Sequence, residues 1–271
     1  MRTQAELCAA FRSLHERPGA FIIPNPWDVG SARVLAGLGF EALATTSSGF
    51  AYSLGKRDGH ATRDEVLEHV RALVAAVDVP INADLENAYG DAPEIVAETF
   101  RLVVGLGVAG ASVEDASGNK DNPIYDIELA AERVGAAADA VRGLSSPVMV
   151  TARAENYLHG RPDLSDTIKR LQAFQEAGAD VLYAPGIKTR EEIVAVCSSV
   201  DRPVNVLCGI PGMDFTLTDL ADLGAKRIST GGLMARAALG GLLRAAADLR
   251  EGSFEFARDA AAFRDVIQWL E

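Results

Sequence analysis

The stretch Leu220–Ser229, LADLGAKRIS, ends a segment of helical periodicity at Gly224 and leads within a few residues into a short apolar run. Glycine at such a position can adopt the left-handed conformation that ends a helix and lets the chain reverse tightly. A helix-to-strand connection this short is typical of the bottom of an α/β barrel. The same pattern, with Gly39, Gly107 and Gly178 in the corresponding place, occurs in three more stretches: Leu35–Ala44 (LAGLGFEALA), Val103–Ser112 (VVGLGVAGAS) and Phe174–Tyr183 (FQEAGADVLY).

Short apolar runs alternate with helical segments along the whole chain. Each run is short enough for a buried strand, and segments such as Arg63–Val77 and Ile127–Val141 carry apolar residues at three- and four-residue spacing. Strand alternating with helix predicts a parallel sheet, and eight repeats favour closure into a (β/α)8 TIM-type barrel. We expect one domain over residues 1–271. The eight runs are Ala20–Ile23, Ala42–Thr45, Ile81–Ala83, Ala111–Val113, Val148–Thr151, Val181–Tyr183, Val204–Leu207 and Arg227–Ser229.

The end of the chain carries an additional element. Phe254–Glu271 is predicted to be an extra amphipathic helix that follows the helix Leu233–Leu249. A terminal helix so rich in large apolar side chains needs a surface to cover them. We therefore expect this helix to dock on its own barrel or on a neighbouring subunit.

Composition limits the partners of the chain. Its net charge is −12 and no run of Lys or Arg forms a patch, which argues against nucleic acid. No apolar stretch approaches the ~20 residues that span a bilayer, so no membrane partner is expected. Cys8, Cys197 and Cys208 form neither a CxxC pair nor a Cys/His metal spacing. These features predict a cytoplasmic protein that acts on a small molecule.

Acidic residues follow two neighbouring runs. Asp84 and Glu86 come after the third run, and Glu114 and Asp115 after the fourth. Because barrel active sites lie at the C-terminal ends of the strands, we expect these four side chains to converge. Close carboxylates raise one another's pKa, and a hard divalent cation relieves their repulsion. The sequence therefore predicts bound Mg²⁺, with Mn²⁺ as the alternative ion. The competing interpretation is that the acids cap helices or pair with Arg153.

Other polar residues belong to the same end of the predicted barrel. Arg153 suits a substrate carboxylate or phosphonate, because a guanidinium binds such groups bidentately. Its alternative role is a salt bridge to Glu155 or Glu114. The segment 47–49 (Ser-Ser-Gly) is suited to presenting N–H and hydroxyl groups to an anion. Glu155 and Asn205 are further candidates for contact with the substrate.

Four blocks of this sequence resemble the isocitrate lyase and phosphoenolpyruvate mutase superfamily. They occur in order, at barrel spacing, over nearly the whole chain. The resemblance implies a barrel enzyme that makes or breaks a bond next to the enolate of a 2-oxo acid, with Mg²⁺ and an arginine stabilising the developing charge. It also implies a homo-oligomer, a dimer or tetramer, in which the last helix is exchanged between subunits. The blocks are NPWDVGSARVLAGLGFEALATTSSGFAYSLGKRDG (25–59), ADLENAYGD (83–91), GASVEDASG (110–118) and TARAENYLHG (151–160).

The resemblance implies roles for single residues as well. Asp84 would be the principal Mg²⁺ ligand, with Glu86 and Glu114 in the metal shell, mostly through water. Asp58 would lie near both metal and substrate, and Arg153 would bind the anionic part of the substrate. The carboxylate or phosphonyl end of the substrate would be held by three neighbouring residues: Ser48, Gly49 and Phe50.

The loop after Glu114, DASGNKDNPIYD, would be the gate that shields the reacting centre. Isocitrate and methylisocitrate lyases carry a cysteine in this gate, whereas no cysteine lies between Cys8 and Cys197 here. That departure argues against those two activities. Lys120 and Asn122 are similar to the gate of phosphoenolpyruvate mutases and phosphonopyruvate hydrolases.

These observations lead to three hypotheses about function. The first is a Mg²⁺-dependent lyase that cleaves a C–C bond in a small 2-oxo or 2-hydroxy di- or tricarboxylate through a metal-stabilised, pyruvate-like enolate. Asp58, Glu155 or a metal-bound water would then move the proton. The alternative is P–C bond chemistry of the phosphoenolpyruvate mutase or phosphonopyruvate hydrolase type. The third is a metabolite-binding barrel without catalysis.

Overall fold

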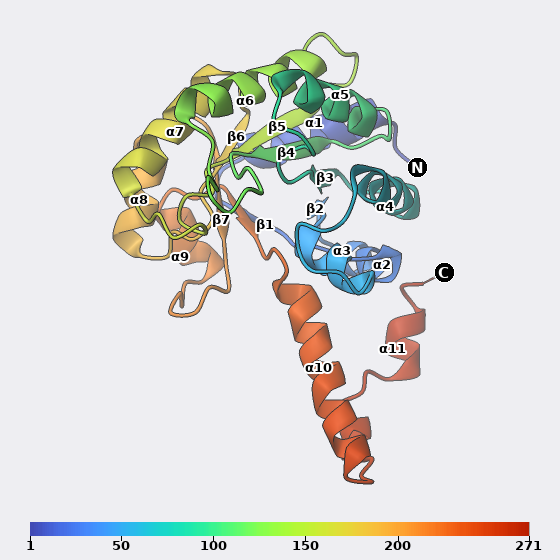
Figure 1. The fold of residues 1–271 in the computed structure, drawn as a ribbon. Coiled ribbons are helices and arrows are strands. Elements are labelled where there is room, and N and C mark those ends of the chain that lie inside the picture. The colour runs from blue at the N-terminus through green and yellow to red at the C-terminus, as the bar shows by residue number, and fades with distance from the viewer. Residues whose placement is uncertain (271) are drawn as a thin grey trace.

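Eight parallel strands form the centre of the molecule in a computed structural model that describes residues 1–270 (Figure 1). The strand order is β1-β8-β7-β6-β5-β4-β3-β2, and each predicted run coincides with a strand to within two residues. This confirms the (β/α)8 barrel. The strands are β1 (Phe21–Ile23), β2 (Leu43–Ala44), β3 (Ile81–Asp84), β4 (Gly110–Glu114), β5 (Met149–Arg153), β6 (Val181–Tyr183), β7 (Val204–Leu207) and β8 (Arg227–Ser229).

The barrel closes at a seam between β1 and β2. In the part of the chain that the structure describes, these two strands share no ladder of their own. A backbone hydrogen bond from Ala44 N to Pro24 O (3.1 Å) joins them instead. The Asn25 side chain adds a second link, because its Nδ2 donates to Thr45 O at 2.8 Å. The sheet is therefore a nearly closed cylinder with one thin joint.

Helices surround the strands and begin at side chains that cap them. Thr62, for example, accepts a hydrogen bond from Glu65 N while the Glu65 carboxylate accepts one from Thr62 N, which satisfies donors left free at a helix start. The four repeat glycines all have a positive φ, between 91° and 109°, so the predicted junctions are confirmed. The helices are α1 (Gln4–Glu16), α2 (Val29–Gly37), α3 (Ser47–Ser53), α4 (Arg63–Ala76), α5 (Pro93–Val104), α6 (Ile127–Val141), α7 (Leu164–Glu176), α8 (Arg190–Ser198), α9 (Leu217–Asp222) and α10 (Leu233–Arg250).

Helix α1 packs across the N-terminal end of the strands. Its Gln4 Nε2 donates to the Val108 carbonyl just before β4, and the ring of His15 lies edge-on to Phe21 at the start of β1. Phe11 of the same helix is fully buried. This end of the barrel is therefore covered, and the opposite end is left open for a site.

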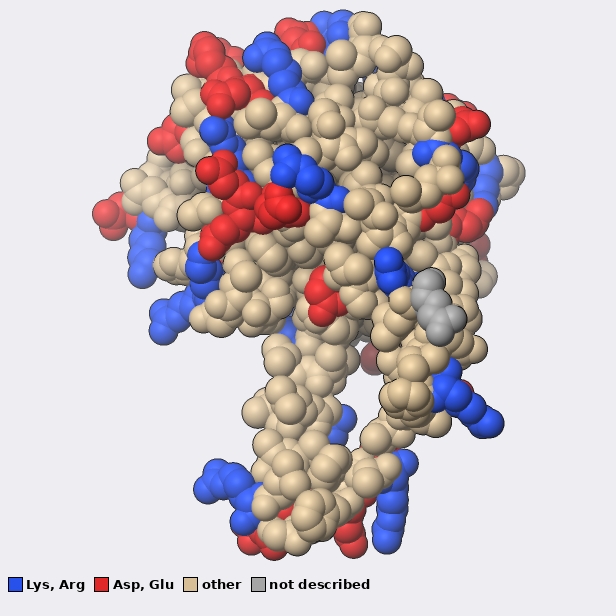
Figure 2. All heavy atoms as spheres, turned by 90° about the vertical axis from the view of Figure 1, so that its right-hand side faces the viewer, with Lys and Arg blue, Asp and Glu red and all other residues tan. Residues whose placement is uncertain are grey.

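The C-terminal arm, residues 233–270, leaves the barrel. Helix α10 projects away from it, and the chain then returns through a 3-10 turn, η1 (Glu255–Arg258), and a short helix, α11 (Phe263–Ile267) (Figure 1). Near its end the chain contacts α2, where Arg33 Nη1 donates to Leu270 O at 2.7 Å and Trp269 lies against Gly37. In Figure 2, α10 and the returning segment are two separate projections below the barrel.

The predicted extra C-terminal helix is confirmed as α11, but it is much shorter than the predicted range Phe254–Glu271, of which Glu271 lies outside the described residues. The physical reason is that a short helix is stable only when one of its faces is packed. Phe254 and Phe263 are 72% and 81% exposed in a single chain, so no packed face extends through this segment. Within residues 1–270, no helix is long and apolar enough to cross a membrane.

Candidate active site

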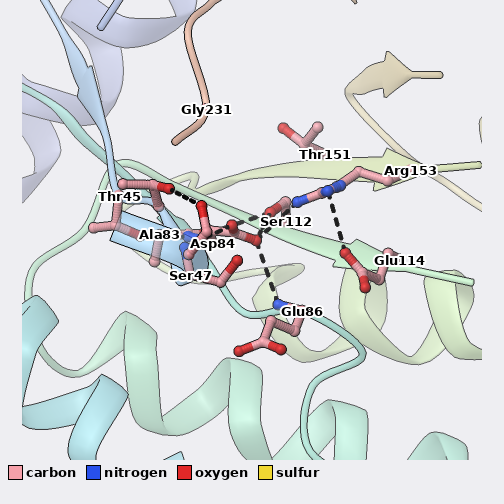
Figure 3. Close-up of polar contacts among 12 residues, drawn as sticks. Thr45, Ser47, Ala83, Asp84, Glu86, Ser112, Glu114, Thr151, Arg153 and Gly231 are labelled. Carbon is pink, nitrogen blue, oxygen red and sulfur yellow. Dashed lines mark hydrogen bonds and ion pairs between the residues drawn. The ribbon is translucent and has the colours of Figure 1, made fainter. Parts of the chain in front are cut away.

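The carboxylate of Asp84, at the end of β3, lies at the centre of the open mouth of the barrel (Figure 3). Its Oδ1 accepts hydrogen bonds from Arg153 Nη1 (2.9 Å) and Ser112 Oγ (3.4 Å), and its Oδ2 accepts one from Ser47 N (3.2 Å). Thr45 Oγ1 accepts a hydrogen bond from Asp84 N at 2.7 Å. Neighbouring strands thus hold this carboxylate in one orientation.

Arg153, at the end of β5, connects three carboxylates. Its guanidinium makes ion pairs with Asp84 (2.9 Å), Glu155 (2.8 Å) and Glu114 (3.4 Å). It also lies 5.0 Å above the ring of Tyr183. Burial by itself would lower the pKa of Arg153, but Glu155, Glu114 and Asp84 together raise it above its ordinary value, so the group stays charged.

The loop after β3 has an unusual backbone. Glu86, Ala88 and Tyr89 have φ values of 51°, 58° and 66°, in the left-handed region that is costly for residues other than glycine. The buried side chain of Arg133 on α6 holds this loop by donating to the carbonyl oxygens of Asn87, Gly90 and Asp91 at 2.5–2.6 Å. Strain at a functional site persists when surrounding contacts determine it, and Arg133 provides those contacts.

The strained loop brings Glu86 to the mouth. Its Oε1 is buried and has no hydrogen-bond partner among the described residues. Burial, followed by the charges of Asp84 and Asp58, raises the pKa of Glu86 to about 8. Burial also raises the pKa of Glu114 well above its usual value. Glu86 and Glu114 are therefore harder to ionise than ordinary carboxyl groups.

These residues fit a hard divalent cation. An oxygen-only donor set, an orphaned buried carboxylate oxygen and raised carboxyl pKa values are the features that such an ion relieves. Over residues 1–270, however, no three acids, histidines or cysteines come close enough to hold an ion by side chains alone. Mg²⁺ retains several waters in most protein sites, and Asp84, Glu86 and Glu114 would hold it largely through water.

The predicted substrate-binding residues occupy different positions. Ser48 and Asn205 line a cavity of about 170 Å³ at the barrel mouth, together with Asp84 and Arg153. Glu155 lines an adjoining hollow and is itself buried against Arg153.

Gly49 and Phe50 of α3 are buried behind the cavity wall. A Cβ at position 49 would lie 2.7 Å from Thr46 and 2.9 Å from Trp27, so only glycine fits there. The ring of Phe50 stacks on His69 with 4.0 Å between centroids. The side chain of Phe50 is therefore a core group, and a direct contact with the substrate would have to come from the backbone.

Asp58 lies at the rim. Its side chain is solvent-exposed and touches the mouth cavity and both adjoining hollows. Partial burial, with a contribution from Asp84, raises its pKa above the ordinary value. A carboxyl group that is easier to protonate, at the point where three hollows meet, is well placed to exchange protons with a ligand.

Asp115 does not join the acid cluster, contrary to expectation. Its Oδ1 accepts a hydrogen bond from Glu155 N (2.8 Å), and its Oδ2 pairs with Arg170 of α7 (3.1 Å). Successive side chains along an extended chain point to opposite faces. Since Glu114 faces the mouth, Asp115 faces the helix layer, where it supports the backbone that follows β5.

Sequence reasoning missed three residues at or near the mouth: Tyr183, Arg133 and Arg227. Tyr183 ends β6 and could have been found from that position alone. Arg133 is part of an ordinary amphipathic pattern in α6, and nothing local distinguishes it from a surface arginine. Arg227 was visible as a charged residue inside an apolar run, which is a usable signal.

The sequence matches the phosphoenolpyruvate phosphomutase family over residues 11–250. A solved structure of a Burkholderia cenocepacia protein, described provisionally as a lyase/mutase, is 56% identical, covers 98% of this chain and 96% of its own, and gives a TM-score of 0.96. An uncharacterized protein of Mycobacterium tuberculosis is 34% identical over 90% of each chain. An oxaloacetate decarboxylase of Bradyrhizobium diazoefficiens is 31% identical over 74% of this chain and 73% of its own. The chain therefore belongs to the phosphoenolpyruvate phosphomutase family and is an enzyme of the phosphoenolpyruvate mutase/isocitrate lyase superfamily.

Proposed function

We propose that this enzyme is a divalent-metal-dependent lyase that cleaves a C–C bond in a small 2-oxo or 2-hydroxy di- or tricarboxylate and leaves a pyruvate-like enolate. The observation that carries the proposal is Arg153, which forms ion pairs with three acids and, together with Asp84, lines a small cavity at the barrel mouth. The similarity to an oxaloacetate decarboxylase supports this substrate class.

In this proposal the acids Asp84, Glu86 and Glu114 would hold Mg²⁺ or Mn²⁺. When bound, the ion supplies positive charge next to the enolate oxygen that forms as the bond breaks. Arg153 presents its guanidinium to the same side of the cavity and binds a substrate carboxylate. Because three carboxylates fix its orientation, little reorganisation is needed as negative charge develops.

A proton must also reach or leave the reacting carbon, and Asp58 is the candidate for this step. It is at the rim and in contact with solvent, whereas Glu155 is buried and tied to Arg153. The gate loop supplies no cysteine, since Cys8 and Cys197 are the nearest cysteines on either side of it. Asp58 at the mouth therefore replaces the gate cysteine of other relatives.

The test is turnover of a substrate panel with Mg²⁺: oxaloacetate, malates, alkylated malates and citrates, monitored by release of pyruvate or another 2-oxo acid. EDTA is expected to abolish turnover, Mn²⁺ or Mg²⁺ to restore it, and oxalate to inhibit it. Full activity in EDTA would refute the metal. Phosphonopyruvate belongs in the same panel, because phosphorus turnover by NMR without C–C cleavage would identify P–C chemistry instead.

Two matched variants test the role of Asp58. Asp58→Asn is expected to lower kcat by about 10²-fold or more while oxalate still binds. Asp64→Asn, in an exposed acid of the first turn of α4, is the control and should leave kcat unchanged. Equal kcat values for the two variants would show that a group other than Asp58 transfers the proton.

We also propose that the C-terminal arm joins copies of the chain into a homodimer or homotetramer. Leu242, Leu243 and Phe263 of the arm are 63%, 70% and 81% exposed, which is costly for large apolar groups. Light scattering should give a mass of two or four chains of 28.6 kDa each. Leu243→Asp is expected to lower that mass, and a wild-type mass of one chain would contradict the proposal.

A further inference from the structure

A second arginine lies at the floor of the mouth cavity. Arg227 is the first residue of β8 and is only 3% exposed. Its Nε donates to Asn205 Oδ1 at 2.8 Å, and its Nη2 donates to Thr151 Oγ1 at 3.2 Å. Its Nη1 is buried and has no partner among residues 1–270. Arg227 lines the cavity, so this guanidinium has an unsatisfied donor in the cavity floor.

Arg227 also lacks a counterion. Within the described chain, no carboxylate lies within ion-pair distance of it, in contrast to Arg153 with its three acids. Burial lowers the pKa of Arg227 to about 9, which still leaves the group charged at neutral pH. A buried charge without a partner is unfavourable, so this position favours the entry of an anion.

The surroundings of Arg227 fit a carboxylate better than an apolar group. Asn82, Ser112, Asn205 and Ser229 line the same cavity and present amides and hydroxyls. Barrel interiors usually contain layers of branched apolar side chains, so a polar floor at this level is unusual.

The cavity has room for a small molecule between the two arginines. Arg227 and Arg153 both line its volume of about 170 Å³. One water needs about 10–15 Å³ on this measure, so the cavity has room for a small organic acid. A ligand with an anionic group at each end would pair with both guanidinium groups at once.

We propose that Arg227 forms a second anion subsite, which binds the carboxylate of the substrate that is remote from the metal. The inference rests on the proposed function and narrows it: the substrate is a short dicarboxylate whose far end reaches the barrel floor. Arg153 and the acids bind the reacting end, and Arg227, which is oriented by Asn205, selects the length. A monocarboxylate such as pyruvate leaves the subsite empty and binds more weakly.

Binding measurements without turnover test this directly. Calorimetric titration of the Mg²⁺-loaded protein with malonate, succinate and glutarate should show a preferred length, and that diacid should bind at least tenfold more tightly than propionate. Arg227→Met should abolish this preference and leave oxalate affinity within about twofold. Arg227→Lys should restore part of the preference, because it keeps the charge.

Each outcome decides the matter. If Arg227→Met weakens the binding of oxalate and of diacids equally, the role of the arginine is structural. If it weakens the binding of neither, the cavity floor holds only water. Either result would overturn the proposed subsite. Should Arg227→Met fail to fold, the wild-type length series decides, because equal affinity for diacids and propionate refutes the proposal. Tight diacid binding without C–C cleavage would support the subsite and refute the proposed lyase activity. Unchanged oxaloacetate turnover in Arg227→Met would support the lyase activity and refute the subsite.

Discussion

Replacing Arg133 by Met should release the loop that carries Glu86, and the structure allows the size of the effect to be worked out. Arg133 is 1% exposed and donates three hydrogen bonds to loop carbonyls. Hydrogen bonds to a charged group contribute about 1.5–3 kcal/mol each, and desolvation of the guanidinium offsets part of that sum. Against them stand three left-handed residues that cost about 1–2 kcal/mol each. The two sums are comparable, so the loop keeps its shape because of Arg133.

When Arg133 is lost, the strain is relieved as the loop relaxes, which limits the loss of stability. We expect the free energy of unfolding to fall by about 2–4 kcal/mol, measured by urea denaturation. The larger effect should be local. Amide hydrogen exchange over residues 85–91 should become faster than in the wild type, and Mg²⁺ affinity should fall by about 10–100-fold, as for other residues that orient metal ligands.

Arg142→Met is the matched control for this variant. Arg142 follows the same helix, α6, and pairs with Asp139, but both side chains are 68% exposed. Exposed ion pairs contribute about 0–1 kcal/mol, so this variant should leave exchange in the loop and metal affinity unchanged. If Arg133→Met lowers stability while loop exchange and Mg²⁺ affinity stay at wild-type values, the loop is held by other contacts and the reasoning fails.

Three further predictions concern pH, sterics and a buried ion pair. Burial, followed by the charge of Arg227, lowers the pKa of His15 to about 3, below its unfolded value near 6.5. The free energy of unfolding should therefore fall by about 2 kcal/mol from pH 7 to pH 5, which urea denaturation would show as a lower midpoint. His15→Gln should remove that part of the pH dependence. Gly232→Ala, at the N-cap of α10, places a Cβ against the side chain of Ser48 and should raise KM, whereas Gly240→Ala within α10 meets only a flexible arginine and should not. Arg170→Met leaves a buried carboxylate uncompensated and should cost about 3–5 kcal/mol in the free energy of unfolding; a loss under 1 kcal/mol would mean that the carboxyl group becomes protonated instead.

Much of the fold was predictable from local pattern. The glycine at each helix-to-strand junction and the short apolar runs depend on neighbouring residues only, and β6, β7 and β8 have the predicted boundaries. The general location of the acids also followed from topology, because residues after parallel strands gather at one end. Asp84 and Glu114 indeed lie on either side of Arg153.

Other features depend on contacts that no local pattern contains. The direction of Asp115 is set by Arg170, which is 55 positions away in sequence. The three carbonyl contacts of Arg133 depend on a loop more than 40 positions earlier in the chain. The course of the chain after Gly252 depends on what covers its apolar residues, and a single chain covers few of them. Tertiary contacts, rather than local preference, decide each of these features.

The seam between β1 and β2 gives the barrel a preferred line of opening. Seven of its joints are ladders between paired strands, whereas the eighth depends on one backbone bond and on Asn25. Asn25 Oδ1 also accepts hydrogen bonds from Thr230 N and Gly231 N at 2.9 Å, so this amide fastens three strand ends together. Local unfolding follows the path that breaks the fewest contacts. We therefore expect the barrel to open first between β1 and β2, and the side chain of Asn25 to be the main contact that keeps it closed there.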